Sequence, residues 1–365
     1  MFRKRKIEER AVSLSALTWK RFKKEKPAMV SLGFIICTII IAILGYTITP
    51  DATPYCNDQH LEISLQKPGF KVQMLNLQDN RNVKTVSFIH KMLWGQPAQY
   101  TSIPITQYWE SNDSIFIYRF GQEEFTEAYP RTLLAQTNSI EWRKYPLGTD
   151  RYGRDVLSML LMGSRISLAV GFISVTIAIF IGILLGAIAG YYRGKVDDII
   201  MWFINVIWSI PTLLLVIAIS FALGKGFWQI FIAIGLTMWV DVARVVRGQV
   251  ISLKEQEFVE AGKALGFSGI HIIIRHILPN VLGTVIVLAA SNFSSAILME
   301  AGLSFLGIGV QPPTPSWGMM MKENYAYIVL DQAYLAIVPG IAIMLLVLAF
   351  MLIGSGLRNA MDIKN

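Results

Sequence analysis

Six apolar segments are the feature that most constrains the fold of this chain. The first covers residues 28–48, and as a helix its 21 residues span roughly 31 Å, close to the thickness of the hydrocarbon core of a bilayer. Five more follow, near 165–189, 199–222, 229–240 (continuing as an amphipathic stretch to about 247), 281–299 and 334–354. The pattern predicts an all-α polytopic membrane protein with six transmembrane helices.

Composition and charge agree with this prediction. Apolar residues make up 53% of the chain and charged residues only 16%, against about 25% charged in soluble domains. If the N-terminus lies inside, the cytoplasmic segments carry 19 lysines and arginines, and the short outer loops carry only Lys225 and Lys322. The positive-inside rule therefore places both termini in the cytoplasm. We interpret the net charge of +8 as a signal of orientation and lipid contact, with no nucleic-acid partner.

The predicted domains follow the same segmentation. Residues 1–27 form a basic cytoplasmic N-terminus, and 28–48 form an uncleaved first transmembrane helix, because the segment is too long for a signal peptide. Residues 49–144 form an extracytoplasmic insert. Alternating stretches at 71–75 and 114–118, with turn residues at 68–69 and 111–113, indicate that it is small and β-rich. Residues 145–365 carry the other five helices and a cytoplasmic loop at 241–280.

Several functional classes are excluded by missing motifs. Two cysteines cannot build a disulfide framework. His271 and His276 stand five residues apart, so on an α-helix they would not share a face and would not form a metal site. Each Gly-Lys pair lacks the following Ser or Thr of a phosphate-binding loop. We therefore expect no catalytic residues, no metal and no bound cofactor in this chain.

The loop at 241–280 is predicted to be a compact pair of helices. Its first helix carries small residues at 261, 262 and 264 that leave one face open for close docking. Gly266 is suited to end this helix, and Ser268 to cap a second helix that stops before Pro279. Two interpretations stay open, namely a docking surface for another protein and a helix lying on lipid headgroups.

Local features of the spans give further expectations. Pro211 should kink the third span, and Gly182, Gly186 and Gly190 permit close helix approach. In the fifth span Asn292, Ser295 and Glu300 form a polar side that lines a translocation path or, alternatively, makes hydrogen bonds between helices.

Two loops also carry expectations. Asp150 and Asp155 can pair with Arg151 or Arg154 as exposed ion pairs, which favours a structural gate over a substrate site. The glycines and prolines of 302–318 rule out a regular helix, so this segment is a re-entrant or capping element near the pathway mouth, or a plain outer loop.

Four motifs resemble one known family. The first motif resembles the coupling-loop pattern of permease subunits of ABC-type importers. It consists of Glu260-Ala261-Gly262, then Gly266, then His276-Ile277-Leu278-Pro279. Here Gly262 replaces the usual second alanine. Stretches 146–158, 300–318 and 354–362 resemble the oligopeptide/dipeptide/nickel branch, in the type with an extra extracytoplasmic segment after the first span.

This resemblance implies a type I ABC importer permease fold in the bacterial inner membrane. It assigns ATPase coupling to Glu260, Ala261, Gly262, Leu265 and Gly266. The implied partners are a homologous second permease in a heterodimer, two ATPase subunits that use ATP and Mg²⁺, and an extracytoplasmic solute-binding protein. The expected function is import of peptides or a related small solute by alternating access. The alternative is an ATP-independent channel or another kind of transporter.

Overall fold

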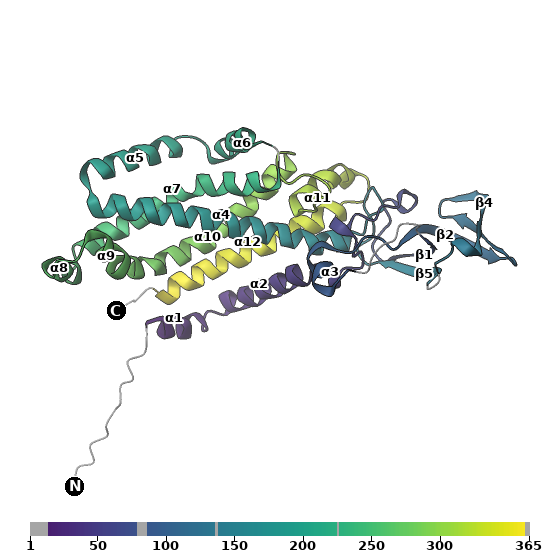
Figure 1. The fold of residues 1–365 in the computed structure, drawn as a ribbon, viewed down its shortest axis with the longest axis horizontal. Helices are drawn as coiled ribbons and strands as arrows, with labels where there is room; N and C mark the ends of the chain where they lie inside the picture. Colours follow the sequence, from purple (N-terminus) through teal and green to yellow (C-terminus); the bar gives the residue numbers. More distant parts are fainter. Residues whose placement is uncertain (1–13, 79–85, 136–137, 225, 362–365) are drawn as a thin grey trace, which may run out of the picture.

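The computed structural model describes residues 14–78, 86–135, 138–224 and 226–361. A helical bundle lies along the long axis, and a β-sheet stands beyond one end of it (Figure 1). The short helices α8 and α9 lie at the opposite end, close to the end of the last helix. The helices of the bundle and its loops are α1 (Leu14–Phe22), α2 (Lys26–Leu44), α4 (Val156–Tyr192), α5 (Gly194–Trp208), α6 (Thr212–Leu223), α7 (Phe227–Lys254), α8 (Glu257–Ala264), α9 (Gly269–Ile272), α10 (Leu278–Phe305), α11 (Trp317–Asn324) and α12 (Tyr334–Met361).

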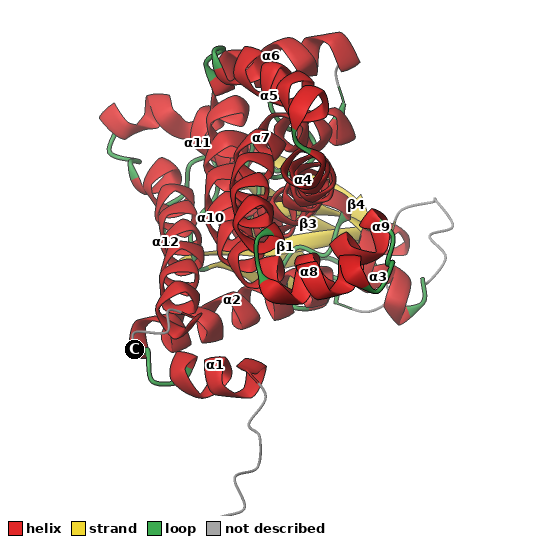
Figure 2. Ribbon diagram, turned by 90° about the vertical axis from the view of Figure 1, so that its left-hand side faces the viewer, coloured by secondary structure: helices red, strands yellow, loops and turns green. Residues whose placement is uncertain are grey.

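Five helices in the described residues are long and apolar enough to cross a membrane, and a sixth span is present if α5 and α6 count as one. This confirms a mostly helical polytopic fold. Seen from the α8 end, α4, α7 and α10 occupy the middle, with α5 and α6 on one flank and α2 and α12 on another (Figure 2). Helices α4, α7, α10 and α12 run past the apolar segments expected for them, whereas α2 ends at Leu44, before the expected limit at 48.

The third span differs from the expected kinked helix. Its two halves, α5 and α6, meet at 95°, with the break at 209–211. Pro211 has no N–H to donate and crowds the preceding turn, so some disruption is expected there. A proline kink is normally held within limits by neighbouring helices. Here α6 is mostly exposed, so little packing holds the two halves in line.

The three glycines of α4 lie against α7, which confirms the predicted close approach to another helix. A Cβ atom on Gly182 would come within 2.5 Å of Val242 Cβ, and one on Gly190 within 2.8 Å of the Arg247 carbonyl oxygen. A Cβ on Gly186 would collide with the carbonyl oxygen of Ala243. The stripe therefore lets the backbones of the two helices approach closely.

Replacing Gly186 by leucine should separate α4 from α7. The nearest obstacles are backbone atoms of Ala243, which cannot rotate away. Overpacking of this kind costs about 1–3 kcal/mol or more. We expect a lower thermal unfolding midpoint for the purified protein in detergent. Gly33→Leu is the matched control, because nothing lies within 4 Å of a Cβ at Gly33. Equal midpoints for the two variants would contradict the close packing.

The insert contains a five-stranded antiparallel sheet in the order β4-β3-β2-β1-β5. Its apolar core is built from alternate residues of the inner strands, including Leu75, Ile105 and Ile117. The predicted strands at 71–75 and 114–118 and the predicted turns that precede them are confirmed. The strands are β1 (Phe70–Gln78), β2 (Tyr100–Glu110), β3 (Ser114–Arg119), β4 (Gln122–Pro130) and β5 (Ile140–Tyr145), with α3 (Phe88–Trp94) between β1 and β2.

Arg165 of α4 connects the insert to the bundle. Its guanidinium group donates to the carbonyl oxygens of Ala42 at 2.9 Å, Leu93 at 2.7 Å and Met92 at 3.0 Å, which lie at the ends of α2 and α3. A cation is favourable at these positions because helix C-termini carry partial negative charge. No sequence pattern marks this residue, because its partners are backbone carbonyl groups.

Candidate functional site

The predicted coupling segment is a separate short helix at the end of the molecule away from the sheet (Figure 1). Glu260, Ala261 and Leu265 of this segment are exposed, and Leu265 keeps 74% of its surface accessible. Phe258, Phe267 and Ile270 of the same loop are exposed as well, and a group of exposed apolar side chains, unlike a single leucine, favours contact with another molecule. Acidic residues in the first turn of α8 and Lys263 in its last turn suit the helix dipole.

The opposite face of α8 holds it to the bundle. Val259 is fully buried in a cluster with Val250 of α7, Ile272 of α9 and Tyr191 of α4. Gly262 is buried as well. The expectation that Gly262 shares the open small-residue face is therefore wrong. It lies at the joint between α8 and α9, where a helical period of 3.6 brings it onto the side of Val259.

Gly266 ends α8 as predicted. Its φ angle is +78°, in the left-handed region that favours glycine. The Gly266 N–H donates to the Lys263 carbonyl at 2.9 Å, and the Phe267 N–H donates to the Gly262 carbonyl at 3.1 Å. These two bonds form a Schellman motif, which closes the helix and turns the chain sharply toward α9.

The second helix of the loop differs from its prediction. Ser268 caps α9, accepting from the His271 N–H at 3.4 Å. The helix does not stop before Pro279, however, but continues through a π-helical turn at Ile273–Ile277 into α10. Pro279 is the second residue of α10, directly after this π turn, and its missing N–H removes one backbone bond from the continuous helix.

The π turn also corrects the argument about the two histidines. A π-helix places residues five apart on the same side. The rings of His271 and His276 accordingly lie 5.8 Å apart, and both contact the ring of Phe267. They form part of the joint between α8, α9 and α10.

Replacing Gly262 by alanine should leave transport intact and stabilise α8. A Cβ at Gly262 would meet Phe267 at 3.5 Å and Ile272 at 3.7 Å, which are ordinary contacts. Alanine favours a helix over glycine by about 1 kcal/mol. We expect an unchanged or higher thermal midpoint and uptake within about twofold of wild type. Loss of uptake by a correctly inserted Gly262→Ala protein would show that the joint needs glycine itself.

At the sheet end, Arg154 forms a buried ion-pair cluster. Its Nε donates to Asp150 Oδ2 at 2.7 Å, and its Nη2 donates to Glu323 Oε2 at 2.7 Å. The pairing of Asp150 with Arg154 was predicted, but the expected exposure was wrong, because both side chains are almost fully buried. Burial alone would lower the pKa of Arg154, yet the two carboxylates raise it. The cluster ties the entry of α4 to α11.

Asp155 is a helix cap rather than an ion-pair partner. Its Oδ2 accepts from the backbone N–H of Ser158 at 2.9 Å and from the hydroxyl of Ser158 at 2.5 Å. The same hydroxyl accepts from the N–H of Asp51 at 2.9 Å. Burial raises the pKa of Asp155, and the nearby Asp51 carboxylate adds to the rise. The cap therefore fixes the chain that leaves α2 against the start of α4.

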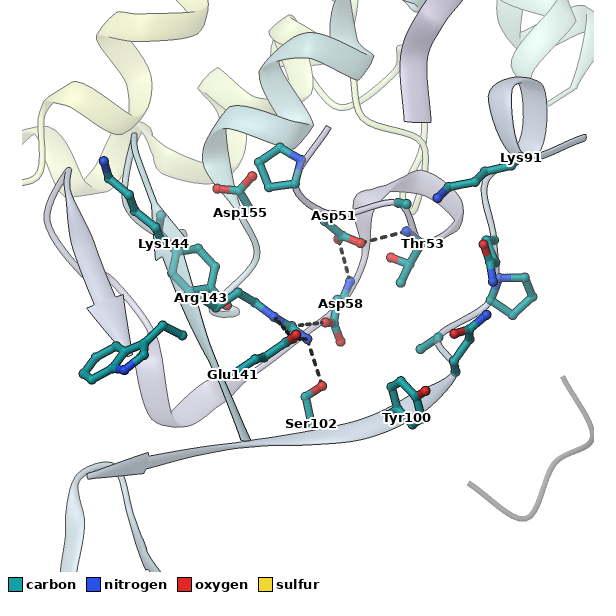
Figure 3. A pocket seen from close by; sticks show the side chains of 18 residues that line it. Asp51, Thr53, Asp58, Lys91, Tyr100, Ser102, Glu141, Arg143, Lys144 and Asp155 are labelled. Carbon is teal, nitrogen blue, oxygen red and sulfur yellow. Dashed lines mark hydrogen bonds and ion pairs between the residues drawn. The ribbon is translucent and has the colours of Figure 1, made fainter. Parts of the chain in front are cut away.

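An open polar cavity of about 650 Å³ lies between this cap and the sheet (Figure 3). On one side Arg143 bonds to Asp58 at 2.9 Å and to Ser102 at 2.9 Å. Lys91 and Lys144 lie on opposite sides of the cavity. No motif in the sequence marked this cavity, because its lining comes from separate segments, namely the chain after α2, α3 with the loop that follows it, β2 and β5.

The structure separates the three residues expected to line a pathway. Ser295 is exposed and Asn292 is half-buried on α10. Glu300 is fully buried and accepts from the Ser304 hydroxyl at 2.6 Å. Glu300 therefore does not share the exposed side of Ser295, since five residues along a helix turn its side chain well away from it.

The segment expected to cap the pathway mouth is partly helical. Regular helix α10 continues to Phe305, past the expected limit at Gly302, and α11 begins at Trp317. Trp317 is buried and donates from Nε1 to the Leu160 carbonyl of α4 at 2.8 Å. The residues between the helices are held by Ser304, whose hydroxyl accepts from the Val310 N–H at 3.0 Å. The segment thus packs into the bundle and is not a plain loop.

Comparison with known proteins gives consistent matches. Residues 182–363 match the inner membrane component of binding-protein-dependent transport systems, and residues 13–68 match the N-terminal transmembrane domain of oligopeptide transport permease C. A dipeptide transport permease of Alkalihalophilus pseudofirmus is 40% identical over 69% of this chain and 81% of that protein. One of Lactococcus lactis is 32% identical over 98% of this chain and 92% of that protein. A glutathione transport permease of Pectobacterium atrosepticum is 42% identical over 62% of this chain and 74% of that protein.

These matches cover both the bundle and the first span, and they agree with the motifs around Glu260 and Gly266. Permease subunits of this kind carry no ATPase site and work with separate ATPase subunits. The fold is that of a type I ABC importer permease. The chain belongs to the family of binding-protein-dependent inner-membrane transport components, and within it to the oligopeptide and dipeptide permeases.

Proposed function

We propose that this subunit imports peptides, such as di- or oligopeptides, and that ATP hydrolysis by its partners drives the transport through α8. One observation carries the coupling role: α8 is exposed on one face, anchored by Val259 on the other, and sharply ended at Gly266. The names of the relatives, which transport dipeptides and glutathione, support the cargo class.

In this proposal the exposed face of α8 docks into an ATPase subunit. Glu260, Ala261 and Leu265 make the contact, and Gly266 sets the angle between α8 and α9, which together form the arm that reaches the ATPase. Gly262 contributes from inside the joint. ATP and Mg²⁺ are used by the two ATPase subunits, and this chain needs no cofactor of its own. Closure of the ATPases pushes α8, and the continuous helix from α9 into α10 transmits the movement to the pathway.

The pathway lies between this chain and a homologous second permease, in a heterodimer. The exposed flank of α5 and α6 and the exposed polar residue Ser295 of α10, with Asn292 beside it, support an uncovered surface of this kind. A solute-binding protein delivers peptide at the sheet end, where the cavity near Arg143 offers polar contacts. Both termini lie in the cytoplasm with α8.

Reconstitution of the two permeases with the two ATPase subunits in vesicles, with the binding protein added, tests the function. We expect uptake of radiolabelled alanylalanine only with ATP, both ATPase subunits and the binding protein present. Uptake that persists without the ATPase subunits would support a channel. No uptake under any condition would remove peptide as the cargo class.

A further inference from the structure

The short helix α3 of the insert exposes a group of large apolar side chains. Phe88, Ile89 and Trp94 keep between 61% and 68% of their surface accessible, and Leu93 keeps 39%. These side chains make up most of α3, which has seven residues. A group of apolar side chains that stays uncovered outside the spans indicates contact with another molecule.

The C-terminal end of α3 is fixed against the rest of the chain, so the fold sets the direction of its apolar side. The Arg165 guanidinium group donates to the Leu93 carbonyl at 2.7 Å. The Gln96 N–H donates to the Ala52 carbonyl at 2.8 Å. Gly95, with a φ angle of +81°, lies so close to the same carbonyl that a Cβ atom would come within 2.9 Å of its oxygen. The helix cannot turn its apolar side inward without breaking these contacts.

The neighbouring span fixes the level of α3 relative to a bilayer. The apolar segment Lys26–Thr47, which contains α2, has 22 residues and is about 33 Å long as a helix, against a hydrocarbon core of about 30 Å. Because this span is only just long enough, its last turns must lie at the bilayer boundary. The guanidinium group that holds Leu93 also donates to the Ala42 carbonyl in the last turn of α2, at 2.9 Å. The C-terminal end of α3 therefore lies at the boundary as well (Figure 1).

The two sides of α3 differ as the sides of an interfacial helix do. Lys91 lines the polar cavity beside the sheet (Figure 3), and Met92 is half-buried. The other sides carry the exposed apolar residues, and α3 stands at the margin of the molecule (Figure 2). His90, which is exposed with them, packs its ring against that of Trp94 at 5.3 Å. Helices that lie in a membrane interface place aromatic and aliphatic side chains on the lipid side in this way.

The position and composition of this surface fit a bilayer. Tryptophan is enriched at membrane–water interfaces, where its ring sits at the headgroup level. Ile40 and Ile43 in the last turns of α2 are exposed too, so apolar surface is open on both helices where they meet. We propose that α3 inserts its four apolar side chains into the adjacent lipid leaflet and anchors the insert to the membrane. This inference holds for any cargo and does not depend on the proposed function.

The anchor has a consequence for the polar cavity. Lys91 and the apolar side chains belong to the same helix, so lipid on one side of α3 fixes the cavity wall on its other side. The sheet is thereby held at a set height above the bilayer.

Spin labels on single cysteines test the proposal. The complex of the two permeases and the two ATPase subunits is reconstituted in vesicles of phosphatidylcholine and phosphatidylglycerol, after replacement of the native cysteines as Cys37→Ser and Cys56→Ala. Labels are placed at Phe88→Cys and Ile89→Cys. Phe125→Cys on β4 is the matched control, because Phe125 is an equally exposed apolar side chain of the same insert, at 72%. Power saturation then compares collisions with oxygen, which concentrates in lipid, and with nickel-EDDA, which stays in water.

We expect a higher ratio of oxygen to nickel collisions at positions 88 and 89 than at position 125. Equal ratios at the three positions would place α3 in water and overturn the proposal. Low collision rates with both reagents at positions 88 and 89 would show that a protein, such as the second permease, covers α3, and this would overturn it as well.

A measurement on the wild-type complex avoids any folding defect of the variants. A phosphatidylcholine with a photoactivatable diazirine close to its headgroup is included in the vesicles, and proteolytic peptides are analysed by mass spectrometry after illumination. We expect lipid adducts on residues 88–94 and none on residues 122–130 of β4. Adducts on α2 without any on α3 would overturn the assignment.

Discussion

Replacing Gly266 by valine should abolish transport while leaving membrane insertion intact. Nothing lies within 4 Å of a Cβ at Gly266, so steric contact is not the reason. The reason is the φ angle of +78°, which a β-branched residue adopts only at a cost of roughly 1–3 kcal/mol. The Schellman motif should open, and the angle between α8 and α9 would no longer be defined. ATP-dependent uptake by reconstituted vesicles is the measurement, with wild-type ATPase subunits throughout.

A graded series makes this test specific. Asparagine tolerates left-handed backbone better than other L-residues, so Gly266→Asn should keep most of the uptake. Uptake by Gly266→Ala should lie between that of Gly266→Asn and that of Gly266→Val. Uptake at the wild-type rate by Gly266→Val would show that the coupling assignment is wrong. Equal loss in all three variants would mean that glycine is needed because an ATPase subunit approaches its surface, and not for its conformation.

Replacing Arg154 by methionine should destabilise the sheet end of the bundle more than any exposed ion-pair change. The substitution removes the cation that both buried carboxylates contact, so Asp150 loses its ion pair and Glu323 keeps only the more exposed Arg151, at 3.5 Å. Breaking a buried pair in this way costs about 3–5 kcal/mol. We expect a large fall in the thermal unfolding midpoint of the purified protein and poor yield in membranes.

Two controls separate charge from packing. Arg119→Met likewise removes a cation with two carboxylate partners, Glu127 at 2.8 Å and Glu62 at 3.3 Å, but these side chains are between one-quarter and one-third exposed, so its effect should stay below about 1 kcal/mol. A triple variant, Arg154→Met with Asp150→Asn and Glu323→Gln, removes both buried carboxylates together with their cation and should recover much of the lost stability. If Arg154→Met unfolded at the wild-type temperature, the cluster would not contribute to stability.

Features encoded locally were predictable from the sequence. Apolar length identified the spans, alternation identified strands β1 and β3, and a single glycine marked the end of α8. The glycine stripe of α4 was also informative, because spacing by four residues places small side chains on one helix face. In each case the residues that carry the signal are close together in the chain.

Features that depend on distant partners were not predictable. Arg154 meets Glu323, which is 169 positions away, and this contact converts an expected surface pair into a buried one. Gly262 was assigned to the wrong face of α8 because only packing against Ile272 decides which side is covered. The break at Pro211 exceeded the expected kink for the same reason, since tertiary packing sets the angle that a proline permits.

The π turn at Ile273–Ile277 has a geometric consequence for the arm that meets the ATPase. A single π turn corresponds to one residue inserted into an α-helix. Each α-helical residue advances the chain by about 100°, so this extra residue sets the rotational phase of α8 about the axis of α10. Which face of α8 is presented to the ATPase therefore depends on the number of residues between α8 and α10 as well as on their identity. A loop one residue shorter would carry the same motif on a differently oriented arm.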